Sequence, residues 1–88
     1  MDSNSLANDV TRIEELLRGL DGASDTPNGY MREHLEEARF YLLGSMPQEY
    51  QLNLKLARQL LPEIEDRNLR NGIAAFLDDQ QGALSRTT

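Results

Sequence analysis

The spacing of apolar residues along the chain predicts four helices joined by short connections. Apolar side chains recur on one face of each segment at about 100° per residue, the period of an α-helix. The predicted helices run from about Ser5 to Leu20, Pro27 to Leu43, Ser45 to Ile64 and Arg67 to Gln80. The predicted fold class is all-α: a small, mainly antiparallel four-helix bundle. It forms a single helical domain of residues 1–88, with flexible ends at 1–4 and 82–88.

Signals for helix ends are clearest around the second and third segments. Thr26 followed by Pro27 is a good N-cap with proline at the first helical position. Gly44 is a natural terminator, and Ser45 with Gln48 three residues later matches the capping box. Because this connection is so short, it predicts a tight antiparallel hairpin between the second and third helices.

Pro62 should disturb the end of the third helix, because it lacks a backbone N–H and biases Leu61 away from helical geometry. We expect a kink near Pro62 and a break around residues 65–68, with Asp66 as a candidate cap for the fourth helix. Gly72 lies inside the fourth helix, where glycine costs about 1 kcal/mol relative to alanine. Close packing against another helix would be one reason for a glycine there.

The third segment carries more apolar surface than one neighbouring helix covers. Its main face contains Tyr50, Leu54, Ala57, Leu61 and Ile64, and the arc continues through Leu60, Leu56 and Leu52. The whole arc spans roughly 200°, whereas a surface helix needs about 100°. Two arrangements fit this pattern. The first and fourth helices cover both sides of the third, or a second molecule covers part of it.

Four apolar residues lie off the main faces of the hairpin helices: Phe40, Leu43, Leu52 and Leu56. Phe40 falls among glutamates, on the side that water should reach. Because the two helices are neighbours, the four residues could merge into one exposed patch. We therefore predict a non-enzymatic protein–protein interaction module that self-associates through this patch as a homodimer. As an alternative to a second copy, a helix of another protein could dock in a groove at this patch.

Composition narrows the classes of function. Fifteen acidic residues against nine basic ones give a formal net charge of −6, which opposes nucleic-acid binding and docking on anionic membranes. The absence of cysteine excludes disulfides and thiolate metal sites. The polar start of the chain is unlike a secretory signal, and no apolar stretch approaches the roughly 18 residues of a membrane span. These features predict an acidic, cytoplasmic protein without nucleic-acid or membrane partners.

Candidate chemistry centres on His34, the only histidine. Glu37 follows three residues later, and Tyr30 and Tyr41 share the face of His34. A ligand- or metal-binding bundle centred on His34 is therefore the alternative function. Carboxylate-bridged metal bundles take Glu-x-x-His pairs from two helices, whereas here the order is reversed and a second pair is missing.

Motifs for catalysis and for phosphate binding are missing from the sequence. No serine–histidine–acid arrangement is supported by the residues around the single histidine, and no glycine-rich phosphate-binding segment occurs. We therefore expect no catalytic residue and no enzymatic activity. We also expect no cofactor and no bound metal, because one helix supplies one imidazole and a stable site needs three or four ligands.

Overall fold

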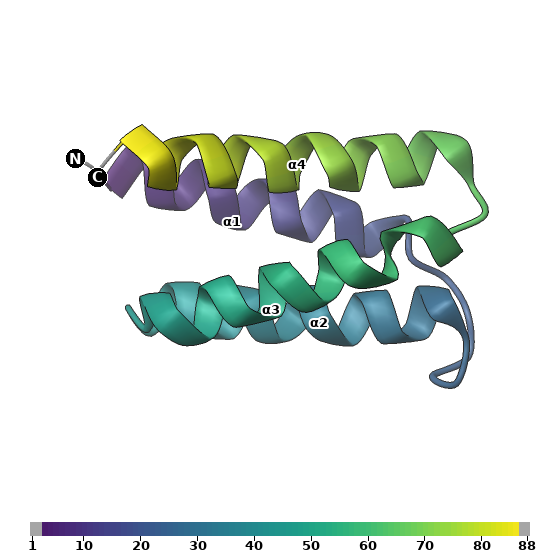
Figure 1. The fold of residues 1–88 in the computed structure, drawn as a ribbon. Helices are drawn as coiled ribbons and strands as arrows, with labels where there is room; N and C mark the ends of the chain where they lie inside the picture. The colour runs from purple at the N-terminus through teal and green to yellow at the C-terminus, as the bar shows by residue number, and fades with distance from the viewer. Residues whose placement is uncertain (1–2, 87–88) are drawn as a thin grey trace.

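The computed structural model describes residues 3–86, and the side chains of residues 6–82, and it confirms the predicted all-α bundle (Figure 1). The helices are α1 (Ser3–Arg18), α2 (Pro27–Leu43), α3 (Pro47–Leu60) and α4 (Arg67–Arg86), with a 3-10 turn, η1 (Leu61–Glu63), between α3 and α4. Each helix runs antiparallel to the one before it (Figure 1). Neighbours along the chain are neighbours in space, and α4 returns to pack on α1.

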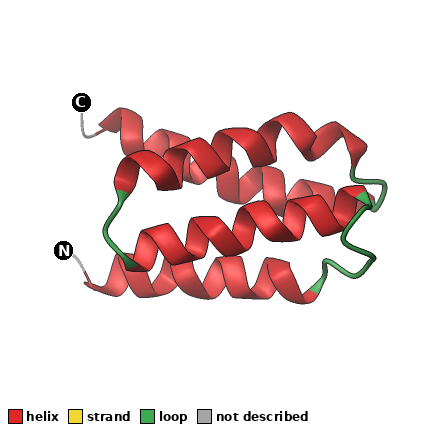
Figure 2. Ribbon diagram, turned by 90° about the horizontal axis from the view of Figure 1, so that it is seen from below, coloured by secondary structure: helices red, strands yellow, loops and turns green. Residues whose placement is uncertain are grey.

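The bundle has two layers. One layer contains α1 and α4 and the other contains α2 and α3 (Figure 1). Figure 2 views the molecule from the α2–α3 side, where a short turn joins the two helices. These two helices are the most closely packed pair in the bundle. Within residues 3–86, no helix lies over the outer face of the α2–α3 layer.

The core lies between the two layers and uses the predicted main face of each helix. Its buried residues are Ile13, Leu20, Met31, Leu35, Ala38, Tyr50, Leu54, Ala57, Ile64, Ile73, Phe76 and Leu77. Leu61 was predicted to share this face but is only partly buried. The predicted departure of Leu61 from helical geometry is also wrong, since its φ of −51° and ψ of −43° are α-helical. Tyr30 lies at the edge of its predicted face and is 47% exposed.

The predicted cap of α2 is confirmed, but the predicted cap of α3 is wrong. The hydroxyl of Thr26 accepts a hydrogen bond from the backbone N–H of Gly29 at 3.1 Å. In contrast, Ser45 has a φ of 58° and belongs to the turn, and Met46 precedes α3 without a side-chain cap bond. Ser45 cannot cap the helix because it takes the left-handed conformation that reverses the chain.

The predicted disturbance near Pro62 is confirmed, but the break lies earlier than the predicted residues 65–68. α3 ends at Leu60, Pro62 lies within η1, and Ile64 is extended, with a ψ of 116°. Asp66 caps α4, since its carboxylate accepts a hydrogen bond from the N–H of Leu69 at 3.0 Å. The change of direction at η1 turns the chain back, so that α4 packs against α1 and α3.

The predicted outer ends of the bundle differ from the structure. α1 spans Ser3–Arg18 and not 5–20, and α4 continues past Gln80 to Arg86. Gly82 does not end α4, because a glycine terminates a helix when it takes a positive φ, and Gly22 is the only described glycine with one. Of the ends predicted to be flexible, residues 1–2 and 87–88 lie outside the described residues, and the rest are helical.

We expect Leu54→Ala to lower the free energy of unfolding by about 2–5 kcal/mol, because it removes packed methyl groups and leaves a cavity. Leu54 is 6% exposed and lies at the centre of the main face of α3. Urea denaturation followed by circular dichroism measures the change. Gln59→Ala, at an exposed position of α3, is the control and should have little effect. Equal losses in both variants would contradict this orientation of α3.

We expect Gly72→Ala to raise the free energy of unfolding by about 0.5–1 kcal/mol, through higher helix propensity. A Cβ atom at Gly72 would lie 3.6 Å from Leu16 Cδ2, an ordinary contact, so packing does not require glycine here. Gly29→Ala is the matched control, because a Cβ there would collide with the carbonyl oxygen of Ala23. Thermal melting compares the variants. If Gly72→Ala lowers the free energy of unfolding, α1 and α4 lie closer together at this point than they do in the structure.

Candidate interaction surface

The four residues predicted for interaction lie on the outer layer formed by α2 and α3, and we call them the α2–α3 surface: Phe40, Leu43, Leu52 and Leu56. Phe40 is 67% exposed, Leu52 is 56% exposed and Leu43 is 52% exposed. Leu56 is partly buried. The α2–α3 pair thus leaves three large apolar side chains more than half exposed. Exposed apolar patches of this kind mark interaction sites.

The ion pairs of the hairpin helices show which way each residue of this surface points. Arg58 of α3 pairs with Asp78 of α4 at 2.7 Å. Leu56 lies two residues before Arg58, about 200° around the helix, and therefore on the side of α3 away from α4. It is partly buried, whereas Leu52, one turn before it, is 56% exposed and points further outward.

Phe40 and Leu43 point in different directions from α2. Arg39 pairs with Glu14 of α1 at 2.9 Å, which marks the α1 side of the helix. Leu43 lies four residues after Arg39 and shares that side, whereas Phe40 lies about 100° further round, on the outer face. Phe40 precedes the centre of the turn by five residues and Leu52 follows it by seven, so they differ by about 3 Å along the axis. Phe40 and Leu52 therefore form a row across the two helices, with Leu56 one turn from Leu52 along α3 and Leu43 at the α1 edge of the layer.

An apolar hollow lies at the end of the bundle where the α2–α3 turn meets the start of α1. Its volume is about 400 Å³, and it is lined by Leu6, Tyr41, Leu42, Ser45, Met46, Pro47 and Tyr50. Sequence reasoning missed it. The signal available in the sequence is weak: Leu6 and Met46 are apolar residues near helix starts, and both are exposed in the structure.

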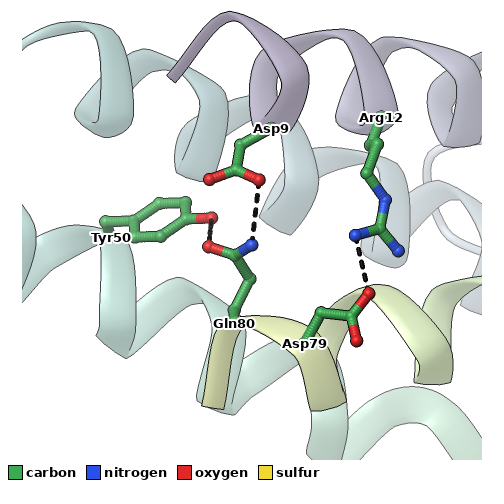
Figure 3. Close-up of polar contacts among 5 residues, drawn as sticks. All are labelled: Asp9, Arg12, Tyr50, Asp79 and Gln80. Atoms are coloured by element: carbon green, nitrogen blue, oxygen red, sulfur yellow. Dashed lines mark hydrogen bonds and ion pairs between the residues drawn. The ribbon is translucent and has the colours of Figure 1, made fainter. Parts of the chain in front are cut away.

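A polar network crosses the interior beside this hollow (Figure 3). The hydroxyl of Tyr50 donates to Gln80 Oε1 at 2.8 Å, and Gln80 Nε2 donates to Asp9 Oδ1 at 3.1 Å. Arg12 pairs with Asp79 at 2.8 Å on the same side of the bundle. No buried polar side-chain atom lacks a hydrogen-bond partner in the part of the chain that the structure describes. The network therefore joins α1, α3 and α4 and leaves no unpaired group for a ligand.

Burial raises the pKa of Tyr50, and the negative charge of Asp9 adds to the shift, while the positive charge of Arg12 opposes it. The phenol therefore keeps its proton at ordinary pH and remains a hydrogen-bond donor. This favours a structural role, because a neutral phenol with a raised pKa is a poor general base.

His34 lies partly buried on α2. Among the side chains of residues 6–82, no group of three or more histidine, aspartate and glutamate residues is arranged to hold a metal ion. A second, open hollow of about 440 Å³ lies at the other end of the bundle from the apolar hollow. It is lined partly by Asp21, Glu63, Glu65 and Asp66. Asp21 belongs to the loop after α1, Glu63 to η1, and Glu65 and Asp66 to the segment between η1 and α4, whereas His34 belongs to α2.

Comparisons with protein-family models, with curated proteins and with solved structures give no match to this chain. None of the helices between residues 3 and 86 has the length and apolar character needed to cross a membrane.

We expect Tyr50→Phe to change how stability depends on alkaline pH. Above about pH 10 the unfolded phenol ionises while the folded one keeps its proton, so the free energy of unfolding falls as pH rises. The contribution of Tyr50 to this fall is up to about 1.4 kcal/mol per pH unit, and it is absent below that pH. Tyr50→Phe should remove this contribution, and it should cost about 1 kcal/mol at neutral pH through the lost hydrogen bond.

Urea denaturation at several pH values between 7 and 11 measures the effect, with the exposed Tyr30→Phe as control. The control should keep the alkaline slope of the parent. Equal slopes in the two variants would show that Tyr50 ionises as readily in the folded protein as in the unfolded chain.

Proposed function

We propose that this chain is a non-enzymatic protein–protein interaction module that forms a homodimer through the α2–α3 surface. The observation that carries the proposal is the exposure of Phe40, Leu43 and Leu52 on one outer layer, above a core that is already complete. An outer layer that needed only to face water would gain solubility from polar residues at these positions.

The size of the apolar surface indicates a weak dimer. Burying a leucine or phenylalanine side chain fully contributes about 1.5–3 kcal/mol. Three side chains per copy, each more than half exposed, therefore supply roughly 5–10 kcal/mol in a dimer. Association costs about 4–15 kcal/mol, and the net charge of −6 on each copy adds repulsion. The largest surplus that these figures allow is about 6 kcal/mol, so we expect a dissociation constant of roughly tens of micromolar or above.

A second copy suits this surface because Phe40 and Leu52 lie side by side across two antiparallel helices. A two-fold axis between the helices places the apolar residues of one copy against those of the other, which is how isologous interfaces form. The absence of cysteine fits a reducing compartment, and we propose the cytoplasm as the location of the dimer.

Leu52→Glu tests the proposal, because it places a charge in the row without disturbing the core. We expect the parent mass in sedimentation equilibrium to rise from 10.0 kDa toward twice that value with concentration. Leu52→Glu should keep its helical circular dichroism and remain monomeric. Leu56→Glu is a poorer test, because Leu56 is partly buried and a buried charge would also unfold the monomer.

Ala75→Glu is the control, since it adds the same charge at an exposed position of α4 outside the α2–α3 surface. It should associate like the parent. A parent that stays monomeric at millimolar concentration would contradict self-association. Association of Leu52→Glu with the affinity of the parent would instead contradict the choice of surface.

A further inference from the structure

Glu36 lies on the edge of the α2–α3 layer that borders α1. Arg32, four residues before it, donates to the carbonyl oxygen of Leu20 at 2.8 Å, just after α1. Arg39, three residues after it, pairs with Glu14 of α1. Residues three and four apart share one side of a helix, so Glu36 lies near this side. Its side chain is exposed.

Lys55 lies on the opposite edge of the layer, which borders α4. It lies three residues before Arg58, whose guanidinium pairs with Asp78 of α4. Lys55 also lines a shallow groove between α3 and α4, together with Leu77 and Gln81. It is the only lysine in the chain, and it is exposed. The outer layer therefore has an acidic edge on α2 and a basic position on α3.

The two residues stand at the same height along the bundle. Lys55 follows the centre of the turn, Ser45, by ten residues, and Glu36 precedes it by nine. In an antiparallel hairpin this difference corresponds to about 1.5 Å along the axis. Because they lie on opposite edges, they do not reach one another within one copy. Neither takes part in the ion pairs among the described side chains.

Two kinds of two-fold axis can place one α2–α3 layer face to face with another. An axis parallel to the helices puts α2 of one copy over α3 of the other. It also keeps each residue at the same position along the bundle, so Glu36 on the acidic edge of one copy meets Lys55 of the other. An axis perpendicular to the helices, in the plane of the contact, puts α2 over α2. This second arrangement inverts positions along the bundle. An axis at Phe40 then leaves only the ends of α2 near the turn in contact, whereas an axis near the middle of α2 brings the exposed Glu36 and Glu37 of the two copies together, where like charges cost affinity.

We propose that the homodimer has its two-fold axis parallel to the helices, with Glu36 of each copy paired with Lys55 of the second copy. This inference rests on the proposed function and specifies its geometry. The apolar row crosses the axis, so Phe40 of each copy lies over Leu52 of the second copy, about 3 Å apart along the bundle. The two ion pairs flank the row and fix which of the two arrangements forms.

Charge reversal tests the pairing. Lys55→Glu and Glu36→Lys should each raise the dimer Kd by roughly tenfold, because symmetry repeats the lost pair and the new repulsion twice. The double variant should return the Kd to within about threefold of the parent value. Sedimentation equilibrium at low salt measures these constants, and circular dichroism checks that each variant is folded.

The sign of the Glu36→Lys effect separates pairing from net charge. This change makes the acidic protein less negative, so a general repulsion between copies would weaken and the Kd would fall. Local pairing predicts a rise instead, since two lysines would oppose one another. The controls are Glu65→Lys and Arg67→Glu, which make matched changes at exposed positions outside the layer. They should shift the Kd only in the direction set by net charge.

Cross-linking gives an independent readout, because the parent has no cysteine. A mixture of Glu36→Cys and Lys55→Cys chains should form a mixed dimer with a short bis-maleimide, and neither chain should cross-link with itself. Self-cross-linking of Glu36→Cys would show the perpendicular arrangement and overturn the inference, as would a double charge variant that is not rescued. Both results leave the homodimer in place. A monomeric parent would overturn the homodimer itself.

Discussion

The three-residue turn between α2 and α3 is the constraint on which the rest of the structure depends. Backbone bonds close α2 at the turn: the N–H of Gly44 donates to the carbonyl oxygen of Phe40, and that of Met46 donates to the carbonyl oxygen of Tyr41. Pro47 then begins α3 directly. With so little chain between them, the two helices must lie side by side and antiparallel. Their main faces turn together toward α1 and α4, and the residues off those faces remain on the outer layer.

Most of the fold could be predicted from the sequence because helical spacing determines which residues face the core. Met31, Leu35 and Ala38 are buried as their spacing predicts. Thr26 and Asp66 are recognisable caps, since a short side chain before a helix can accept from its first N–H groups. Ser45 fits the same local pattern but fails, because the reversal of the chain requires a left-handed residue and takes precedence over a cap.

The polar network and the orientation of the surface residues could not be predicted. Gln80 and Asp9 are 71 residues apart in the chain, and only the packing of α4 on α1 brings them together. The sequence places Leu43 off the main face of α2. Whether it faces α1 or α3 depends on the order of the helices around the bundle, which local spacing does not contain. The same order puts Glu36 and Lys55 on opposite edges of one layer.

The central claim is that copies of the chain meet through the outer face of α2 and α3. Amide chemical shifts, recorded by NMR from low micromolar to millimolar concentration, test it most directly. The account predicts concentration-dependent shifts at Phe40, Leu52 and their neighbours. It predicts constant shifts at Thr11 of α1 and Ala75 of α4, which are exposed in the other layer. Shifts that do not change with concentration, or that change mainly in α1 and α4, would contradict it.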